Sequence, residues 1–259
     1  MSMKPTEVGS LSEYISEINS LHTTMDTIHG DLWFRGMNSP DLELKPGIVW
    51  RGIDERLENT IIAEFNCNSY PLLEKEPKNS WQRYALMQHY GLPTRLLDWT
   101  KSPLVALYFC LLGDNSSDRV VWCIDPFELN KFTVDKETIF TPDTLSEDDG
   151  INISSYLPKS LRELQSTSVP ALPIAIEPPF TNKRILAQQG CFTVHGTKSD
   201  GIEEIFSKNI PGKISLFKIK KELVEELSIQ LHEVGIKEDS IYQDLNSLTS
   251  RIIREFCNV

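Results

Sequence analysis

The chain has 259 residues, of which 40% are hydrophobic and 24% charged, which excludes a fibrous or disordered protein and leaves a globular one with a sizeable core. Its net charge of −11 argues against a broad nucleic-acid surface, because phosphate binding needs Lys and Arg gathered on one face. The five cysteines lack any Cys-x-x-Cys spacing, so the sequence predicts free, mostly buried thiols and no metal site. No run approaches the roughly 20 apolar residues of a membrane span, so we expect a cytoplasmic protein without membrane contact.

The chain opens with a predicted helix and a predicted strand. Ser10 and Glu13 form a capping box, and apolar residues then recur at helical spacing as far as Met25. Residues 31–37, DLWFRGM, predict a strand that follows this helix.

Two further helices are expected before residue 92. The first runs from Asp54 to about residue 65, with Leu57, Ile61 and Phe65 on its apolar face. The second begins at the cap Ser80 and ends at Gly91, with Pro93 just beyond it as a stop signal.

Residues 94–113 form the most apolar stretch of the sequence. A short apolar strand leads to Ser102 as N-cap, Pro103 at the first helical position and Gly113 as terminator. The helix between these signals is apolar nearly all round, so we expect it to be the buried centre of the fold.

The second half predicts strands followed by helices. Strands are expected at 119–125, 173–176, 184–196 and 213–219, and two amphipathic helices at 220–235 and 240–256. The polar residues 130–170 are interpreted as an insertion or a lid.

These elements predict an α+β fold with a mixed, mainly antiparallel β core, surrounding helices and a C-terminal helical hairpin. We expect one domain over residues 1–259, with an N-terminal helix in 1–29, the α/β core in 30–219 and the hairpin in 220–259.

Four segments together resemble one family. They are WFRG at 33–36, LMQHYGLPTRLLDWTKSPLVALYFC at 86–110, RILAQQGCFTVHG at 184–196 and SIYQDLNSLTSRI at 240–252. This combination resembles the FRG domain, which is named for its Phe/Trp-Arg-Gly motif, and the similarity spans residues 30–252.

A weaker resemblance is to the ADP-ribosyltransferases. Their first strand bears Arg or His, their second strand has a Ser-Thr-Ser type signature running into an Ala-x-x-Phe helix, and a later strand carries Glu. Arg35, the segment 98–102 leading into 106–109, and the segment 188–192 follow the same order. The resemblance implies an ADP-ribosyltransferase-like core, NAD as substrate and, by analogy, a toxin or phage-defence setting.

The glutamate of that superfamily is replaced here by Gln188 or Gln189. In the superfamily, the glutamate holds a ribose hydroxyl and supports the positive charge that grows as nicotinamide leaves. A glutamine hydrogen-bonds a ribose but does not balance that charge. Gln188 is therefore the candidate for the catalytic position, either as a working substitute or as part of a site that only binds.

Arg35 is the first candidate for contact with a ligand. It lies on an apolar strand, where an unpaired charge is costly, and its planar guanidinium suits a pyrophosphate. The alternative is a structural pair with Asp98. Gly36 permits close approach of a ligand to the backbone, or else forms a plain turn.

His89 and Tyr90 close the helix before Gly91. His89 is a candidate general base or ribose ligand, and the alternative is a histidine that caps the helix carbonyls. Tyr90 is a candidate for stacking on a nicotinamide or adenine ring, and the alternative is core packing.

Further candidate cofactor ligands follow in the next segment. Thr94 and Arg95 precede the strand, and Arg95 is either a second phosphate ligand or a surface ion-pair partner. Asp98 is a pocket carboxylate or a structural partner for an arginine. Thr100 belongs to the Ser-Thr-Ser-like segment, and Ser102 caps a helix whose N-terminus suits an anion.

Strand alternation within 184–189 places Arg184, Leu186 and Gln188 on one face. This mixed face fits the edge of a pocket, and the alternative is a half-exposed strand whose polar groups meet water.

Three functions remain open on this basis. The first is an ADP-ribosyltransferase-like enzyme or NAD-binding protein with a nucleotide-type small molecule as ligand and a protein as possible target. The second is a non-catalytic nucleotide sensor or protein-interaction module. The third is a hydrolase that uses His89 with Asp98, which requires the two side chains to lie within hydrogen-bond reach.

Overall fold

The computed structural model describes residues 4–27, 30–73, 75–142, 151–162, 168–177 and 183–257. In this part of the chain, a seven-stranded sheet has the order β1-β7-β4-β2-β3-β6-β5. The strands are β1 (Thr6–Val8), β2 (Trp33–Met37), β3 (Leu96–Thr100), β4 (Arg119–Ile124), β5 (Ile174–Ile176), β6 (Gly190–Val194) and β7 (Ile214–Ile219). Only β1 and β7 pair in parallel, so the mixed, mainly antiparallel α+β core is confirmed.

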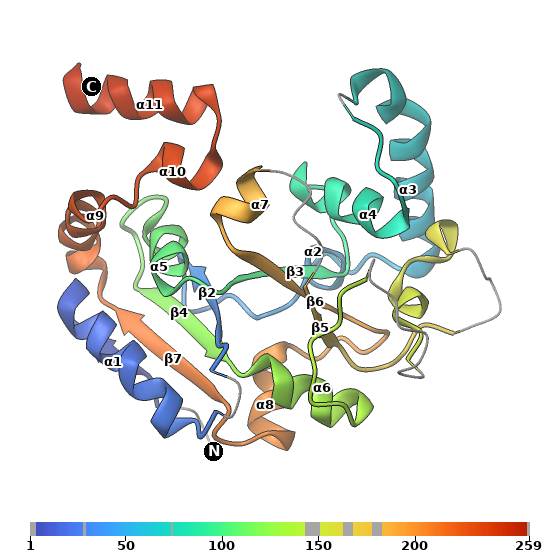
Figure 1. Cartoon of the computed structure of the whole chain (residues 1–259), viewed down its shortest axis with the longest axis horizontal. Helices are drawn as coiled ribbons and strands as arrows, with labels where there is room; N and C mark the ends of the chain where they lie inside the picture. Colours follow the sequence, from blue (N-terminus) through green and yellow to red (C-terminus); the bar gives the residue numbers. More distant parts are fainter. Residues whose placement is uncertain are drawn as a thin grey trace.

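Helices surround this sheet (Figure 1). The first six are α1 (Leu11–Thr24), α2 (Gly47–Trp50), α3 (Glu55–Ser69), α4 (Ser80–His89), α5 (Pro103–Leu111) and α6 (Pro126–Val134). The remaining five are α7 (Lys183–Ala187), α8 (Ile202–Asn209), α9 (Val224–Glu233), α10 (Glu238–Tyr242) and α11 (Leu245–Phe256). Single 3₁₀ turns are η1 (Tyr70–Leu72), η3 (Ile153–Tyr156), η4 (Lys159–Leu161) and η5 (Lys221–Leu223).

Most of the buried apolar side chains in the described residues form three clusters. One joins α1, α5 and α9 to β1, β2, β4 and β7, and it contains Phe34, Leu107 and Phe217. A second joins α8 to the strands through Trp33, Trp99 and other side chains. The third joins α3 and α4 to β5 and β6. Helices therefore contribute to each of the three clusters.

Helix α5 is the buried centre that its sequence predicts. Ser102 accepts a hydrogen bond from the Val105 N–H, Pro103 occupies the first turn, and Val105, Ala106, Leu107, Cys110 and Leu111 are buried. The helix packs against β2, β3 and β4. The main chains of α5 and β2 are in close contact at Gly36, where a side chain would collide with the main chain of α5.

Strands β2 and β3 pair at only one register position, Phe34 with Thr100. Beyond this point the two strands diverge, although β2 continues to pair with β4 and β3 with β6 along their whole lengths. The sheet therefore has a gap between β2 and β3, with Arg35 on one side and the residues before Thr100 on the other.

Two of the helices predicted before residue 92 need correction. The cap of α4 is Asn79, which accepts from the Gln82 N–H at 2.9 Å, so Ser80 is the first helical residue. The inward face of α3 is turned by one residue, with Glu58 and Ile62 buried and Leu57 48% exposed. Glu58 faces the interior because its carboxylate binds the buried guanidinium of Arg95.

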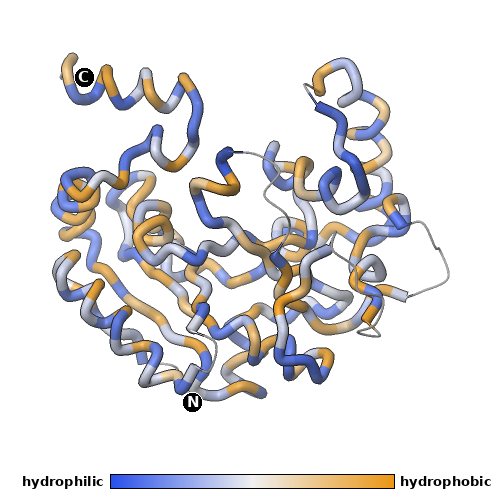
Figure 2. The backbone as a smooth tube through the Cα atoms, in the orientation of Figure 1, coloured by the Kyte–Doolittle hydropathy of each residue, from blue (hydrophilic) through white to orange (hydrophobic). Residues whose placement is uncertain are grey.

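The predicted C-terminal helix 240–256 is divided in two. Gln243 adopts a left-handed conformation, and Asp244 caps α11 by accepting from the Ser247 N–H at 2.8 Å. The expected hairpin of two helices is therefore an arrangement of three, in which His232 of α9 lies 2.9 Å from Glu255 of α11. Figure 2 shows hydrophobic and hydrophilic segments alternating along α11, as in an amphipathic helix.

The segment 130–170 lies only partly within the described residues, since 143–150 and 163–167 fall outside them. Of the rest, 130–134 complete α6, which begins with the cap Asp125 and with Pro126, a signal that the sequence analysis missed. Residues of η3 and η4, among them Tyr156 and Leu161, are buried in the cluster beside α3 and α4. The prediction also missed β1, α2 and α8.

The cysteines are free thiols, and Cys110, Cys123 and Cys191 are buried while Cys67 and Cys257 are exposed. Within the described ranges, no helix has the length and apolar character needed to cross a membrane.

His195, which follows β6, is fully buried, and neither ring nitrogen has a hydrogen-bond partner among the described residues. Burial, with a smaller contribution from the charge of Lys45, lowers the pKa of His195 to about 3. The ring is therefore neutral in the folded protein at all but strongly acidic pH.

Replacing His195 by Leu should make the stability less sensitive to acid. The unfolded chain protonates His195 near its ordinary pKa and the folded chain only near pH 3, so the wild type loses stability as the pH falls between these values. From about pH 7 to about pH 5, the wild type should lose about 2 kcal/mol more than His195→Leu. Urea unfolding at both pH values measures this, and equal losses would mean that the folded ring reaches water.

Replacing Gly36 by Ala should destabilise the fold. An added Cβ would lie 1.9 Å from the Ala106 carbonyl oxygen and 2.6 Å from the Cys110 nitrogen, so α5 has to move away from β2. We expect a loss of about 3 kcal/mol in urea unfolding. Gly9→Ala is the control, because the added methyl group meets only the flexible end of Glu13. A loss for Gly36→Ala no larger than that of the control would contradict this packing.

Candidate functional site

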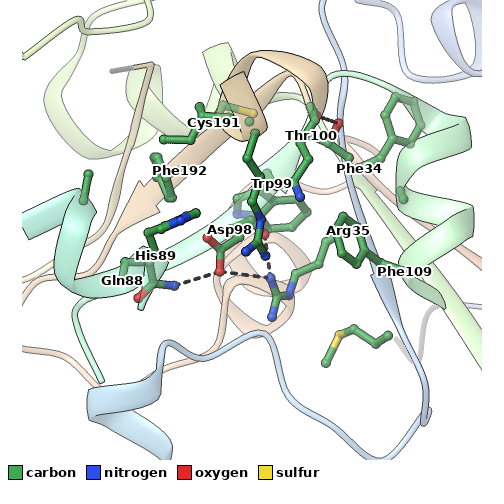
Figure 3. A pocket seen from close by; sticks show the side chains of 18 of the residues that line it. Phe34, Arg35, Gln88, His89, Asp98, Trp99, Thr100, Phe109, Cys191 and Phe192 are labelled. Atoms are coloured by element: carbon green, nitrogen blue, oxygen red, sulfur yellow. Dashed lines mark hydrogen bonds and ion pairs between the residues drawn. The ribbon is translucent and has the colours of Figure 1, made fainter. Parts of the chain in front are cut away.

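A cavity of about 370 Å³ lies where β2 and β3 diverge. Its walls come from both strands, from α4, from α5, and from α7 with the start of β6. The polar side chains at its walls are those of Arg35, Asn38, Gln88, His89, Asp98, Thr100, Arg184 and Gln188. Aromatic rings line it as well, namely Phe34, Trp99, Phe109 and Phe192, and Figure 3 shows them around the central polar group.

Arg35 joins the two diverging strands. Its Nη1 donates to the main-chain oxygen of Asp98 at 2.6 Å and lies 3.9 Å from the Asp98 carboxylate. Its Nε is buried and has no hydrogen-bond partner in the described chain, while 26% of the side chain is exposed. Burial lowers the pKa of Arg35, an effect that Asp98 partly offsets. The guanidinium therefore keeps unused donors at the cavity, where an anion would stabilise its charge.

Asp98 is held by an amide and not by the histidine. The Gln88 Nε2 donates to its carboxylate at 2.7 Å, and the Gln88 Oε1 accepts from the Thr94 hydroxyl at 2.5 Å. Figure 3 shows Gln88, Asp98 and Arg35 in one connected row. The Asp98 side chain remains 56% exposed. Among the described residues that line the cavity, it is the only carboxylate.

His89 lies at the wall of the cavity, at the last position of α4. Burial lowers the pKa of His89, and the nearby charge of Arg184 lowers it further, whereas Asp98 raises it. The imidazole is therefore neutral near neutral pH and can accept a proton. Tyr90 packs edge-on against it with ring centroids 5.1 Å apart, but 72% of Tyr90 is exposed and it does not line the cavity.

The strand expected over 184–189 is wrong. Residues 183–187 form α7, Gln189 adopts a left-handed conformation, and the strand begins only at Gly190. The main-chain N–H of Gln188 donates to the Arg184 carbonyl at 2.9 Å, which closes a helical turn. Arg184, Leu186 and Gln188 therefore do not share the face of a strand, and Leu186 is 58% exposed.

Arg184 and Gln188 nevertheless both line the cavity, held there by the C-terminal helices. The Arg184 guanidinium lies 4.7 Å from the centre of the Tyr242 ring. The Gln188 side-chain amide donates to the Ile241 carbonyl at 3.4 Å. Helix α10 thus positions two polar groups of a cavity whose other walls come from residues far earlier in the chain.

Thr100 and Ser102 have structural hydrogen bonds. The Thr100 hydroxyl donates to the main-chain oxygen of Gln188 at 2.5 Å and accepts from the Ser102 N–H at 3.0 Å. Thr100 lines the cavity, whereas Ser102 caps α5 outside it. Gly36 lines the cavity too, but its lack of a side chain is required by α5 and not by a ligand.

Arg95 is buried and does not line the cavity. It binds the fully buried Glu58 carboxylate through both Nε and Nη2, and the Tyr84 hydroxyl donates to the same carboxylate at 3.1 Å. Thr94 is buried and bonds to Gln88. The surface ion pair left open for Arg95 is therefore a buried one, and neither residue is available to a phosphate.

The sequence analysis did not single out Gln88 or the aromatic walls. Ala85, Gln88 and His89 all line the cavity, and their i, i+3, i+4 spacing on α4 is the signal that would have indicated one face. Tyr242 carried no such signal, because its contact with Arg184 joins residues far apart in the chain.

Comparison with known families gives a match over the part of the chain that contributes the first residues of this cavity. The FRG domain matches residues 30–119. The chain therefore contains an FRG domain. Its span includes β2, α4, β3 and α5, and so Arg35, Gln88, His89 and Asp98. The segments 184–196 and 240–252, which also resemble the family, lie outside the matched span. No curated protein and no solved structure matches the chain.

Removing the charge of Glu58 should destabilise the FRG domain strongly. Glu58→Gln leaves the buried Arg95 guanidinium without a counter-charge, and such losses are about 3–5 kcal/mol. Urea unfolding measures this, and the double variant Glu58→Leu/Arg95→Met should recover most of it. Lys159→Gln, which breaks the exposed pair with Glu55, is the control and should cost less than about 1 kcal/mol. A Glu58→Gln variant as stable as the control would contradict the structural role of Arg95.

Proposed function

We propose that the cavity beside Arg35 binds a nucleotide-type ligand, with NAD as the first candidate. The observation that carries this proposal is the Arg35 guanidinium, which borders the cavity with a buried Nε that has no partner in the described residues. A phosphate group would satisfy those donors with charge-assisted hydrogen bonds. Arg184, which has no carboxylate partner in the described part of the chain, adds a second positive charge at the same cavity.

The cavity also has apolar walls that suit a planar ring. The rings of Trp99, Phe109 and Phe192 border the same space as the two arginines. Ligand sites generally combine such apolar surface with a few polar groups that fix orientation, in cavities of about 300–1,000 Å³. A nucleotide has the corresponding parts, a planar base for the rings and phosphates for the arginines.

The same cavity contains groups suited to transfer of ADP-ribose. In that reaction the bond between nicotinamide and C1′ of the ribose breaks, and its electron pair leaves with nicotinamide. A water or a target side chain then bonds to C1′ and loses a proton. The Asp98 carboxylate would stabilise the positive charge on the ribose, in place of the missing glutamate, and the neutral His89 would take the proton.

A non-catalytic sensor is the second candidate, and the hydrogen bonds of the two groups concerned favour it. The Gln188 amide is engaged by the Ile241 carbonyl, and the Asp98 carboxylate by Gln88. Groups held in this way can recognise a ligand without reacting. The hydrolase pairing of His89 with Asp98 lacks support, since no hydrogen bond joins these two side chains in the described residues.

Replacing Arg35 by Gln should weaken binding of NAD by about tenfold or more, because a charge-assisted hydrogen bond contributes about 1.5–3 kcal/mol. Isothermal titration calorimetry with NAD measures this. Arg56→Gln removes an equal charge from an exposed position on α3 and should bind as the wild type does. Circular dichroism establishes that Arg35→Gln is folded, and unchanged affinity in a folded variant would contradict the proposal.

Turnover separates the two candidates. We expect the purified protein, incubated with NAD and cell lysate, to release nicotinamide if it is an ADP-ribosyltransferase. Asp98→Asn should then reduce the rate by about 100-fold or more while NAD still binds. Mass spectrometry of NAD and of the proteins measures both products. Binding that depends on Arg35 without turnover would assign the protein to the sensor class.

A further inference from the structure

A second hollow of about 220 Å³ adjoins the cavity. It lies between α2 and the loop 91–93 that follows α4, and it shares Arg35, Gln88 and Asp98 with the cavity. The two spaces therefore share one polar cluster as a common wall. In Figure 3 this cluster occupies the centre of the view.

The second hollow has a defined wall. Gly47 packs against Pro93, and an added Cβ there would lie 3.2 Å from the Pro93 Cα. The Ile48 N–H donates to the Thr94 carbonyl at 3.2 Å. These contacts hold α2 against the loop that follows α4. As a result, the residues that end α2 and follow it are held beside Arg35.

More cations than carboxylates line this hollow, although the net charge of the chain is −11. Its lining includes the cations Arg35, Lys45 and Arg51 but only one carboxylate, that of Asp98. Lys45 pairs with Glu43 at 2.9 Å, whereas Arg51 has no carboxylate partner in the described residues. Arg51 therefore leaves a positive charge that no carboxylate of the described residues pairs with, and such a charge favours an anionic ligand.

Arg51 is held by an aromatic ring and not by an acid. Its guanidinium lies 4.2 Å from the centre of the Trp50 ring, and 62% of Trp50 is exposed. A guanidinium stacked in this way keeps the donors at its edge free for a phosphate. Arg184, which lines the first cavity, has the same arrangement on Tyr242. Each of the two spaces that Arg35 borders is thus lined by one further arginine that stacks on an aromatic ring.

We infer that the hollow lined by Lys45 and Arg51 is a second subsite, which binds a phosphoryl group of an extended ligand. Such a ligand lies across Arg35 with one part in the cavity and one in the hollow, as a molecule with a pyrophosphate bridge can. A nucleoside monophosphate fills the cavity alone. This inference rests on the proposed function for the identity of the ligand, but the phosphate subsite can be tested without it.

The test compares three probes, inorganic pyrophosphate, ADP-ribose and AMP, by calorimetry on the full chain in about 0.15 M salt, where charges beyond about 8 Å are screened. Arg51→Gln should weaken binding of pyrophosphate and of ADP-ribose by about tenfold, which is one charge-assisted hydrogen bond, and binding of AMP by less than about twofold. Arg56→Gln is the matched control for loss of one positive charge, and all three probes should bind it as they bind the wild type.

The outcomes distinguish the phosphate subsite at Arg51 from the proposed nucleotide binding at Arg35. If Arg51→Gln changes no probe more than Arg56→Gln does, or weakens AMP as much as ADP-ribose, the second subsite is overturned. If pyrophosphate binds through Arg51 but no nucleotide binds through Arg35, the subsite stands and the proposed function fails. If none of the probes binds the wild type, both are wrong.

Discussion

The hydrogen bond from Arg35 to the main chain of Asp98 is the contact on which the site depends. At this point β2 and β3 have only one paired register position, and beyond it the ladder stops. A side chain thus replaces the main-chain bonds that would otherwise close the sheet. Because a guanidinium has five N–H donors and this contact uses one of them, the same residue that joins the strands can also bind a ligand.

The opening between these strands persists because the surrounding packing holds both of them apart. Strand β2 remains paired with β4 and β3 with β6, and α5 lies against Gly36 so closely that no side chain fits there. The cavity is therefore a consequence of the rigid elements around it. Its polar groups are fixed in the same way, since Gln88 orients Asp98 and α10 holds Arg184 and Gln188.

Positive charge is concentrated at a few places in this protein. The chain is acidic overall, yet Arg35, Arg51 and Arg184 line two adjoining spaces, and the last two stack on aromatic rings. By contrast, Arg95 is neutralised by Glu58 in the interior. Arg95 therefore stabilises the fold, whereas the other three arginines are not enclosed by a buried carboxylate in the described residues. The match to the FRG domain covers Arg35 and Arg51, but not Arg184.

Local signals in the sequence were sufficient to predict α5 and to single out Arg35. Ser102 and Pro103 predicted the start of the helix, and the run after it predicted burial, because capping and hydrophobic periodicity act over a few residues. Arg35 is likewise evident from the FRG motif, which is a run of adjacent residues. Long-range contacts, in contrast, decide that 183–187 are helical, that Arg95 binds Glu58, and that Tyr242 reaches Arg184. Each of these outcomes depends on a partner distant in the chain, and neither propensity nor spacing carries information about such a partner.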